Sequence, residues 1–291
     1  YFTGLGSIPH HAFSDCYLLT SVTIPNSVES IGDGAFGYCS GLTSLTIPNS
    51  VESIAESAFY GCSKLEKLTL AEGSQLKNVG RSAFMRCSNI KEVHIGRIAD
   101  WCRISFQEGS GVPFYSSRNA NLYLKGNLLT EIELTEDITE IGNYCFSYCK
   151  NIRKFIIRCP ITATGVFEGD TGTLVLDTPT LGEYTLSGSA FEELVLEENA
   201  TFDIPVSDKF VTTISKITVS SANPRYDSRE NCNAIIETES STLIRGSLTT
   251  VIPSSVVSIR YSAFSGIGIE SMVIPDSVTS IGGAIFENCT S

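Results

Sequence analysis

Ten cysteines in this 291-residue sequence have side chains that could form disulfides or bind a metal. Six of them follow a phenylalanine by three residues: Cys16, Cys39, Cys62, Cys87, Cys149 and Cys289. Their spacings do not match the C-x-x-C pattern of zinc sites. Because cysteine is among the residue types most often buried, the pattern favours a column of small buried thiols, one in each repeat. Cys145 is expected in the same core, whereas the pairing of Cys102, Cys159 and Cys232 stays open.

The other residues that could do chemistry are histidines and paired carboxylates. The tandem His10-His11 could hold a metal at the surface, but no third ligand is evident, so a solvated turn is favoured. Glu131 and Glu133 could hydrolyse a glycosidic bond, which needs two acids. Nothing nearby indicates the burial that raises the pKa of one acid, so an exposed strand face is favoured. We therefore predict no enzyme activity, no metal and no cofactor, with a carboxylate-based glycosidase as the less favoured alternative.

These residues belong to a repeat. A phenylalanine, usually preceded by alanine, recurs about every 23 residues near the N-terminus and again later, at Phe13, Phe36, Phe59, Phe84, Phe146, Phe264 and Phe286. An L-x-x-L-x-I segment follows most of these turns, as in Leu42/Leu45/Ile47. A period of this length is typical of a solenoid. The alternation predicts one short strand per repeat, and the A-F-x-x-C spacing predicts a turn or a single helical turn.

The fold class predicted from this pattern is an α/β repeat solenoid. We expect a right-handed leucine-rich-repeat superhelix with one parallel β-sheet, short turns or single-turn helices on the other side, and two β-hairpin insertions. The whole chain, 1–291, is predicted to be one solenoid. Its expected parts are regular repeats over 1–98, 129–157 and 252–291, insertions with hairpins over 99–128 and 223–251, and degenerate repeats over 158–222, whose turns have lost the Phe and Cys.

The outward positions of the strands are the predicted binding surface, because residues i and i+2 of a strand share a face and neighbouring strands lie about 4.8 Å apart. Small residues such as Ser21 and Thr23 dominate at the N-terminal end. The best candidates for contacting a ligand are the charged residues in the middle: Glu92, His94, Glu131, Glu133 and Lys154.

Aromatic residues in the first insertion offer a second candidate surface. Trp101, Phe114, Tyr115 and Tyr123 could form a contact platform for protein or sugar, with Trp101 and Tyr115 as the site residues. The alternative is that these residues cover the open edge of the solenoid where the repeats are interrupted.

Composition limits the partners. With 20 Lys and Arg against 32 Asp and Glu, the net charge of -12 repels phosphate backbones and anionic membranes, so we expect no nucleic acid partner. The sequence has no apolar run long enough for a transmembrane helix and no signal peptide. It begins within one repeat and ends at "FENCTS", where a strand is due, so we expect a fragment of a longer chain.

The repeats resemble the BspA-like leucine-rich repeats, whose consensus is close to L-x-x-L-x-I-P-x-x-V-x-x-I-G-x-x-A-F-x-x-C. Residues 12–95, 129–157 and 252–289 match it well, and "NPRYDSRENCNAIIET" looks like a recurrent element of that family. The resemblance implies a cell-surface or secreted protein that binds or adheres to an extracellular protein or glycan without catalysis or membrane insertion. The alternative is a structural spacer for another domain.

Overall fold

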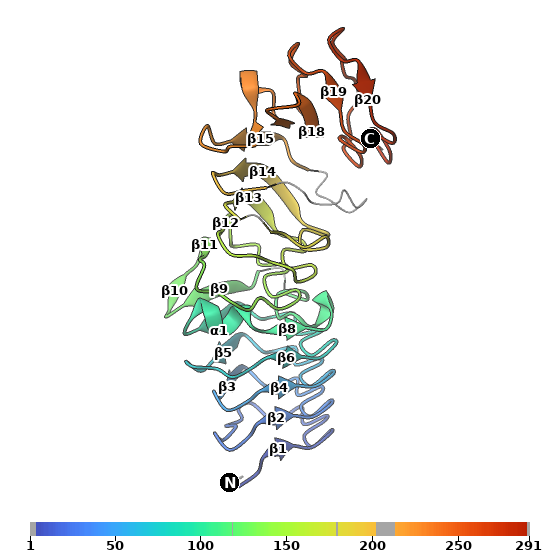
Figure 1. Ribbon diagram of the computed structural model, residues 1–291. Helices are drawn as coiled ribbons and strands as arrows, with labels where there is room; N and C mark the ends of the chain where they lie inside the picture. The colour runs from blue at the N-terminus through green and yellow to red at the C-terminus, as the bar shows by residue number, and fades with distance from the viewer. Residues whose placement is uncertain (1–3, 118, 179, 202–212, 290–291) are drawn as a thin grey trace. The chain divides into compact units, whose positions relative to one another are not determined.

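The computed structural model describes residues 4–117, 119–178, 180–201 and 213–289 (Figure 1). The chain forms two compact units. Unit 1 comprises residues 1–130, 138–152 and 163–170, and unit 2 comprises residues 131–137, 153–162 and 171–291.

Unit 1 contains two sheets. The first is wholly parallel and is built from two-residue strands: β1 (Ser7–Ile8), β2 (Ser30–Ile31), β4 (Ser53–Ile54), β6 (Asn78–Val79) and β8 (Ser105–Phe106). Figure 1 shows these strands stacked in chain order. The second sheet joins β3 (Ser44–Ile47), β5 (Lys67–Leu70), β7 (Glu92–Ile95) and β9 (Asn121–Leu124) in parallel, and β10 (Asn127–Leu128) pairs with β9 antiparallel.

The prediction of one parallel sheet is therefore wrong. A second parallel ladder forms because the repeat period also aligns the Ser-Ile pairs that follow each proline turn, so that Ile31 lies opposite Ile54. Each residue lies beside its equivalent in the next repeat. The backbone N–H and C=O groups on both sides of each repeat can therefore form hydrogen bonds with the neighbouring repeat.

Unit 2 also contains two sheets. The third sheet of the chain is parallel and consists of β11 (Glu131–Leu134), β12 (Lys154–Ile157), β13 (Thr171–Leu176), β14 (Ala190–Leu196) and β15 (Lys216–Val219). In the fourth, β16 (Tyr226–Asp227), β17 (Ala234–Glu237) and β18 (Thr242–Gly246) are antiparallel, and β19 (Ser258–Ile259) and β20 (Ser280–Ile281) continue in parallel.

Two predicted strands do not form. Residues 22–24 and 272–274 are not in strands, so Ser21 and Thr23 do not extend the sheet surface as expected. Just before the first of these segments, the amide and the hydroxyl of Thr43 both donate to the Thr20 carbonyl (3.3 and 3.4 Å). These bonds share one acceptor and do not continue as the evenly spaced series of a parallel ladder, so residues 22–24 do not form a strand.

The A-F-x-x-C segments are turns and not single helical turns. Residues two before and two after the phenylalanine have positive φ, as at Gly34 (55°) and Tyr38 (58°), and a left-handed residue cannot continue a right-handed helix. Among the described residues, α-helix is limited to α1 (Ile98–Cys102), with short 3₁₀ segments at η1 (Gly109–Gly111) and η2 (Arg229–Asn231).

The turns stack on one another through backbone and thiol hydrogen bonds. The amide of Phe36 donates to the carbonyl of Ala58 (2.7 Å), and the thiol of Cys62 donates to the carbonyl of Phe36 (3.2 Å). The same thiol bond recurs at Cys39, Cys87 and Cys289. No disulfide links the ten cysteines, and all but Cys16 and Cys289 are buried, so the predicted column of buried thiols is confirmed at Cys39, Cys62, Cys87 and Cys149.

Burial raises the pKa of thiols in this column. Desolvation raises the pKa of Cys39 to about 12, and a hydrogen bond with Cys87 together with burial raises the pKa of Cys62 further. Because the thiolate is the reactive form, Cys39 and Cys62 serve packing and hydrogen bonding in the folded chain.

Gly80 marks a close approach between repeats that provides a test of the stacking. A Cβ added at Gly80 would lie 2.5 Å from the Glu56 nitrogen. We expect Gly80→Ala to lower the free energy of unfolding by roughly 1–3 kcal/mol in urea denaturation, because backbone of the neighbouring repeat must move. The control Gly6→Ala, with nothing within 4 Å, should change it by less than about 0.5 kcal/mol. Equal effects of the two substitutions would contradict this packing.

Candidate functional site

The exposed face of the second sheet, in unit 1, carries Glu92 and His94 on β7. The His94 imidazole donates to the Glu92 carboxylate (2.8 Å), and this bond lowers the pKa of Glu92. Lys67 on the neighbouring strand lies 3.5 Å from the same carboxylate. On the other side, the imidazole stacks on the Tyr123 ring, with 4.7 Å between centroids. The predicted pair is thus part of a larger cluster of polar and aromatic side chains in register across three strands.

The exposed face of the third sheet, in unit 2, carries a row of polar side chains. One residue from each of five adjacent strands lies in register with the next, in the order Glu131, Lys154, Thr173, Glu193 and Lys216. The Lys154 ammonium is 3.5 Å from Glu131, and Lys216 pairs with Glu193. The hydrogen bond from Lys216 lowers the pKa of Glu193. We call these five residues the polar row.

A second row runs beside the polar row and begins at Glu133. The Arg158 Nε donates to Glu133 (2.7 Å), and the same guanidinium binds Asp177. The next positions along this row are apolar, at Ile156, Val175 and Val195. In this row Val175 is buried (7% exposed), whereas Ile156 and Val195 are half-buried, so the face combines exposed ion pairs with partly covered apolar side chains.

The structure brings Glu131, Glu133 and Lys154 together in unit 2, and Glu92 and His94 together in unit 1. The side chains of Glu131 and Glu133 are 51% and 45% exposed, and each is paired with a cation. Glycosidases obtain their protonated acid by burial, so this arrangement favours contact over hydrolysis.

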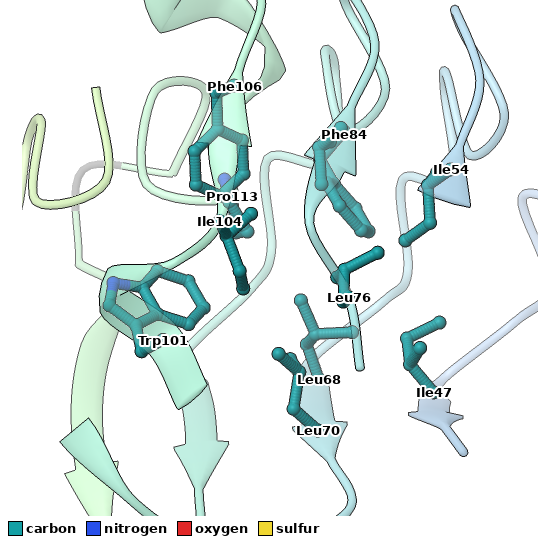
Figure 2. A pocket seen from close by; sticks show the side chains of 11 residues that line it. Ile47, Ile54, Leu68, Leu70, Leu76, Phe84, Trp101, Ile104, Phe106 and Pro113 are labelled. Carbon is teal, nitrogen blue, oxygen red and sulfur yellow. The ribbon is translucent and has the colours of Figure 1, made fainter. Parts of the chain in front are cut away.

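Trp101 does not lie on the surface. It is 1% exposed, its indole nitrogen donates to the Cys145 carbonyl (2.7 Å), and its ring contacts Phe106 and Phe114. Figure 2 shows it directed toward the aliphatic core of unit 1, where only about 10 Å³ of space remains. The contact-platform interpretation is wrong for Trp101 and Phe114, because the insertion uses their apolar surface to fill the core.

Tyr115 is the exposed member of that group, at 44%. Its ring meets Tyr148 edge to face (5.2 Å), and the Tyr148 hydroxyl donates to Glu168 (2.7 Å). Sequence reasoning placed Tyr115 at the surface but did not identify this partner from another turn.

Asp170 is a residue that sequence reasoning missed. It stands three residues after Phe167, in the position of the thiol column, and Phe167 stacks on Phe146 (6.3 Å). The expectation that turns in 158–222 had lost the phenylalanine is therefore wrong here. Asp170 is fully buried, and neither carboxyl oxygen has a hydrogen-bond partner among the described residues. Burial raises the pKa of Asp170 well above its usual range. Aligning V-F-E-G-D with C-F-S-Y-C could have found it.

None of the helices in the described part of the chain has the length and apolar character needed to cross a bilayer.

Three solved structures are similar to this chain. A leucine-rich cell surface protein from Faecalibacterium prausnitzii A2-165 is 22% identical, with a TM-score of 0.37, covering 99% of this chain and 68% of that chain. The pneumococcal vaccine antigen PcpA is 16% identical, with a TM-score of 0.35, covering 93% of this chain and 57% of that chain. A leucine-rich repeat protein from Bacteroides ovatus ATCC 8483 is 17% identical, with a TM-score of 0.35, covering 99% of this chain and 86% of that chain.

No curated protein matches the chain. A family model does match it. The model for the BspA type leucine-rich repeat region matches six copies, over residues 6–107, 118–193 and 239–291. These are the segments whose phenylalanines and thiols stack in the structure, with the most degenerate part of unit 2 left between the last two. The chain belongs to the family of BspA type leucine-rich repeat proteins.

Proposed function

We propose that this protein is a non-enzymatic binding module, exposed on a cell surface or secreted, which presents a sheet face to an extracellular protein or glycan. The observation that carries the proposal is the polar row of unit 2, where four charged residues and Thr173 lie in register on five adjacent strands. Family membership supports the extracellular setting, since the resemblance to BspA-like proteins implies surface or secreted proteins.

The ion pairs of the polar row are suited to exchange. The side chains of Lys154 and Glu131 are 41% and 51% exposed, and exposed pairs of this kind contribute only about 0–1 kcal/mol each. A partner with complementary charges can therefore replace them at little cost. The backbone ladder beneath holds the side chains at a spacing of about 4.8 Å, so the charge pattern is preorganised.

Charge reversal on this face tests the proposal. We expect Glu131→Lys combined with Glu133→Lys to weaken capture of a ligand by about tenfold or more, because the reversed charges repel Lys154 and Arg158 as well as the partner's cations. The measurement is a binding screen of the chain against a panel of extracellular-matrix proteins and a glycan array, followed by affinity measurement on each hit.

The matched control is Glu239→Lys combined with Glu270→Lys, which changes the net charge equally at exposed positions outside the third sheet. Equal weakening by both pairs would contradict a site on the sheet face. Absence of any hit would favour a spacer that holds another domain away from the surface. Polysaccharide turnover abolished by Glu131→Gln would favour the glycosidase alternative.

A further inference from the structure

A groove of about 230 Å³ lies among the turns of unit 1, separate from the residues of the sheet face. Its lining comes from three consecutive repeats, and it includes the rings of His11, Tyr38 and Tyr60 and the backbone of Gly34 and Gly37. The Tyr38 and Tyr60 rings meet at 66° with 5.3 Å between centroids. They therefore form an aromatic corner, with 48% of Tyr38 exposed.

Glycines hold these rings close to the backbone. A Cβ at Gly34 would lie 2.5 Å from the His11 ring, and a Cβ at Gly61 would lie 2.9 Å from the Tyr38 ring. Each ring thus packs on the glycine of the following repeat. On the far side of the corner, the Arg86 guanidinium lies 5.4 Å from the centre of Tyr60. The rings are preorganised by the stack of repeats.

Tyr38 has a backbone conformation that disfavours a tyrosine. Its φ is 58°, and this position, two residues after the phenylalanine, has positive φ in every regular turn: it is glycine at Gly61, Gly169 and Gly266 and a larger residue at Asp15, Arg86, Tyr148 and Asn288. A bulky residue in the left-handed region stores strain, and such strain concentrates at functional sites. At Tyr38 this conformation directs the ring onto Gly61 of the following repeat, beside the groove.

The chemistry of the groove selects a neutral ligand. The residues that line it include rings and the hydroxyls of Ser14 and Ser57 but no carboxylate, lysine or arginine. The nearest charges, Asp15 bonded to the Ser14 hydroxyl (3.2 Å) and Arg86 on the Tyr60 ring, have opposite signs. The net charge of -12 repels anionic polymers. A pyranose ring has an apolar face that packs on an aromatic ring and hydroxyls that hydrogen-bond at its edge. Successive repeats lie about 4.8 Å apart, close to the length that one pyranose adds to an extended glycan.

We propose that the aromatic groove of His11, Tyr38 and Tyr60 binds a neutral, linear glycan built of hexopyranose units, independently of the sheet face. The rings supply stacking and the serine and tyrosine hydroxyls supply hydrogen bonds. Because the groove crosses three repeats, it contacts more than one sugar unit.

The test is isothermal titration of the full 291-residue chain with neutral hexasaccharides (cellohexaose, maltohexaose, mannohexaose and laminarihexaose), a hyaluronan hexasaccharide, and a proline-rich decapeptide. We expect at least one neutral hexasaccharide to bind. Tyr38→Gly should weaken it about tenfold or more, since it removes the ring while relieving the backbone. Tyr38→Phe should retain most of the affinity.

Controls separate this site from the sheet face and from misfolding. Tyr184→Ala removes a tyrosine that is 46% exposed in unit 2, and it should leave binding unchanged. Weakening by Glu131→Lys with Glu133→Lys, together with full binding by Tyr38→Gly, would assign the sugar to the sheet face and contradict the groove. An unchanged melting temperature of Tyr38→Gly shows that the fold persists. The proposal is overturned if no neutral hexasaccharide binds at millimolar concentration, if Tyr38→Gly binds as well as the parent chain, or if the anionic sugar or the peptide binds more tightly.

Discussion

Phe59→Ala is expected to lower the free energy of unfolding of unit 1 by about 3–5 kcal/mol, the range found when a buried phenylalanine is truncated. Phe59 is fully buried and stacks between Phe36 (5.3 Å, 1° between planes) and Phe84 (5.4 Å, 7°). The neighbouring rings are held by their own repeats, so they cannot close the cavity that the substitution leaves. The substitution also removes contacts at two interfaces between repeats. Such interfaces contribute much of the stability of a repeat protein.

The measurement is urea denaturation followed by native-state hydrogen exchange, which assigns the loss to the amides of unit 1. Phe286→Ala is the matched control, because Phe286 is 39% exposed and has one stacked neighbour, Phe264 (5.6 Å). We expect its effect to be less than half as large. Similar losses from the two substitutions would mean that stacking of the rings contributes little to the stability of the solenoid.

Asp170→Asn is expected to remove a pH dependence from the stability of the parent chain. Burial raises the pKa of Asp170 in the folded state, and the thiols of Cys145 and Cys149 lie near it. The Cys149 amide and Lys150 act in the opposite direction. That amide already donates to the Phe146 carbonyl (3.1 Å), so burial prevails. The folded chain therefore retains the proton at a pH where the unfolded chain has lost it.

The sign of the effect follows from proton linkage. A carboxyl whose folded pKa is raised contributes its full stability below the unfolded pKa and loses it as pH rises through the window up to the folded pKa. Within that window the folded state binds one more proton, so the free energy of unfolding falls by up to about 1.4 kcal/mol per pH unit. We expect this slope in the parent chain above the usual pKa of a carboxyl, 3.8, and not in Asp170→Asn.

Urea denaturation between pH 4 and pH 8 measures the slope. Asp276→Asn serves as the control, because Asp276 is exposed, and it should keep the slope of the parent chain. A further variant, Asp170→Cys, places a thiol at the column position. In four other repeats the thiol at this position donates to the carbonyl of the phenylalanine in the previous repeat. This variant should be more stable than the parent chain at pH 7. Parallel pH profiles for the parent chain and Asp170→Asn would show that Asp170 is ionised in the folded state.

The regular repeats were readable from the sequence because their partners lie one period apart. The thiol column, the buried phenylalanines and the outward positions from Glu131 to Lys154 follow from a period near 23, since each residue meets its equivalent in the next repeat. These contacts join each repeat only to its neighbours, so the repeat period of the sequence is enough to predict them.

The tertiary structure alone decided the features that depend on unequal spacing or on backbone conformation. Trp101 donates to a carbonyl 44 residues away, across an interruption of the repeat, so periodicity could not show that it is buried. The strands of the first sheet, such as β2 and β4, have two residues each, and two residues are too few to show an alternation of apolar and polar positions in the sequence. The aromatic groove requires positive φ at Tyr38 and glycines in the following repeat, and these geometric relations exist only once the turns have stacked.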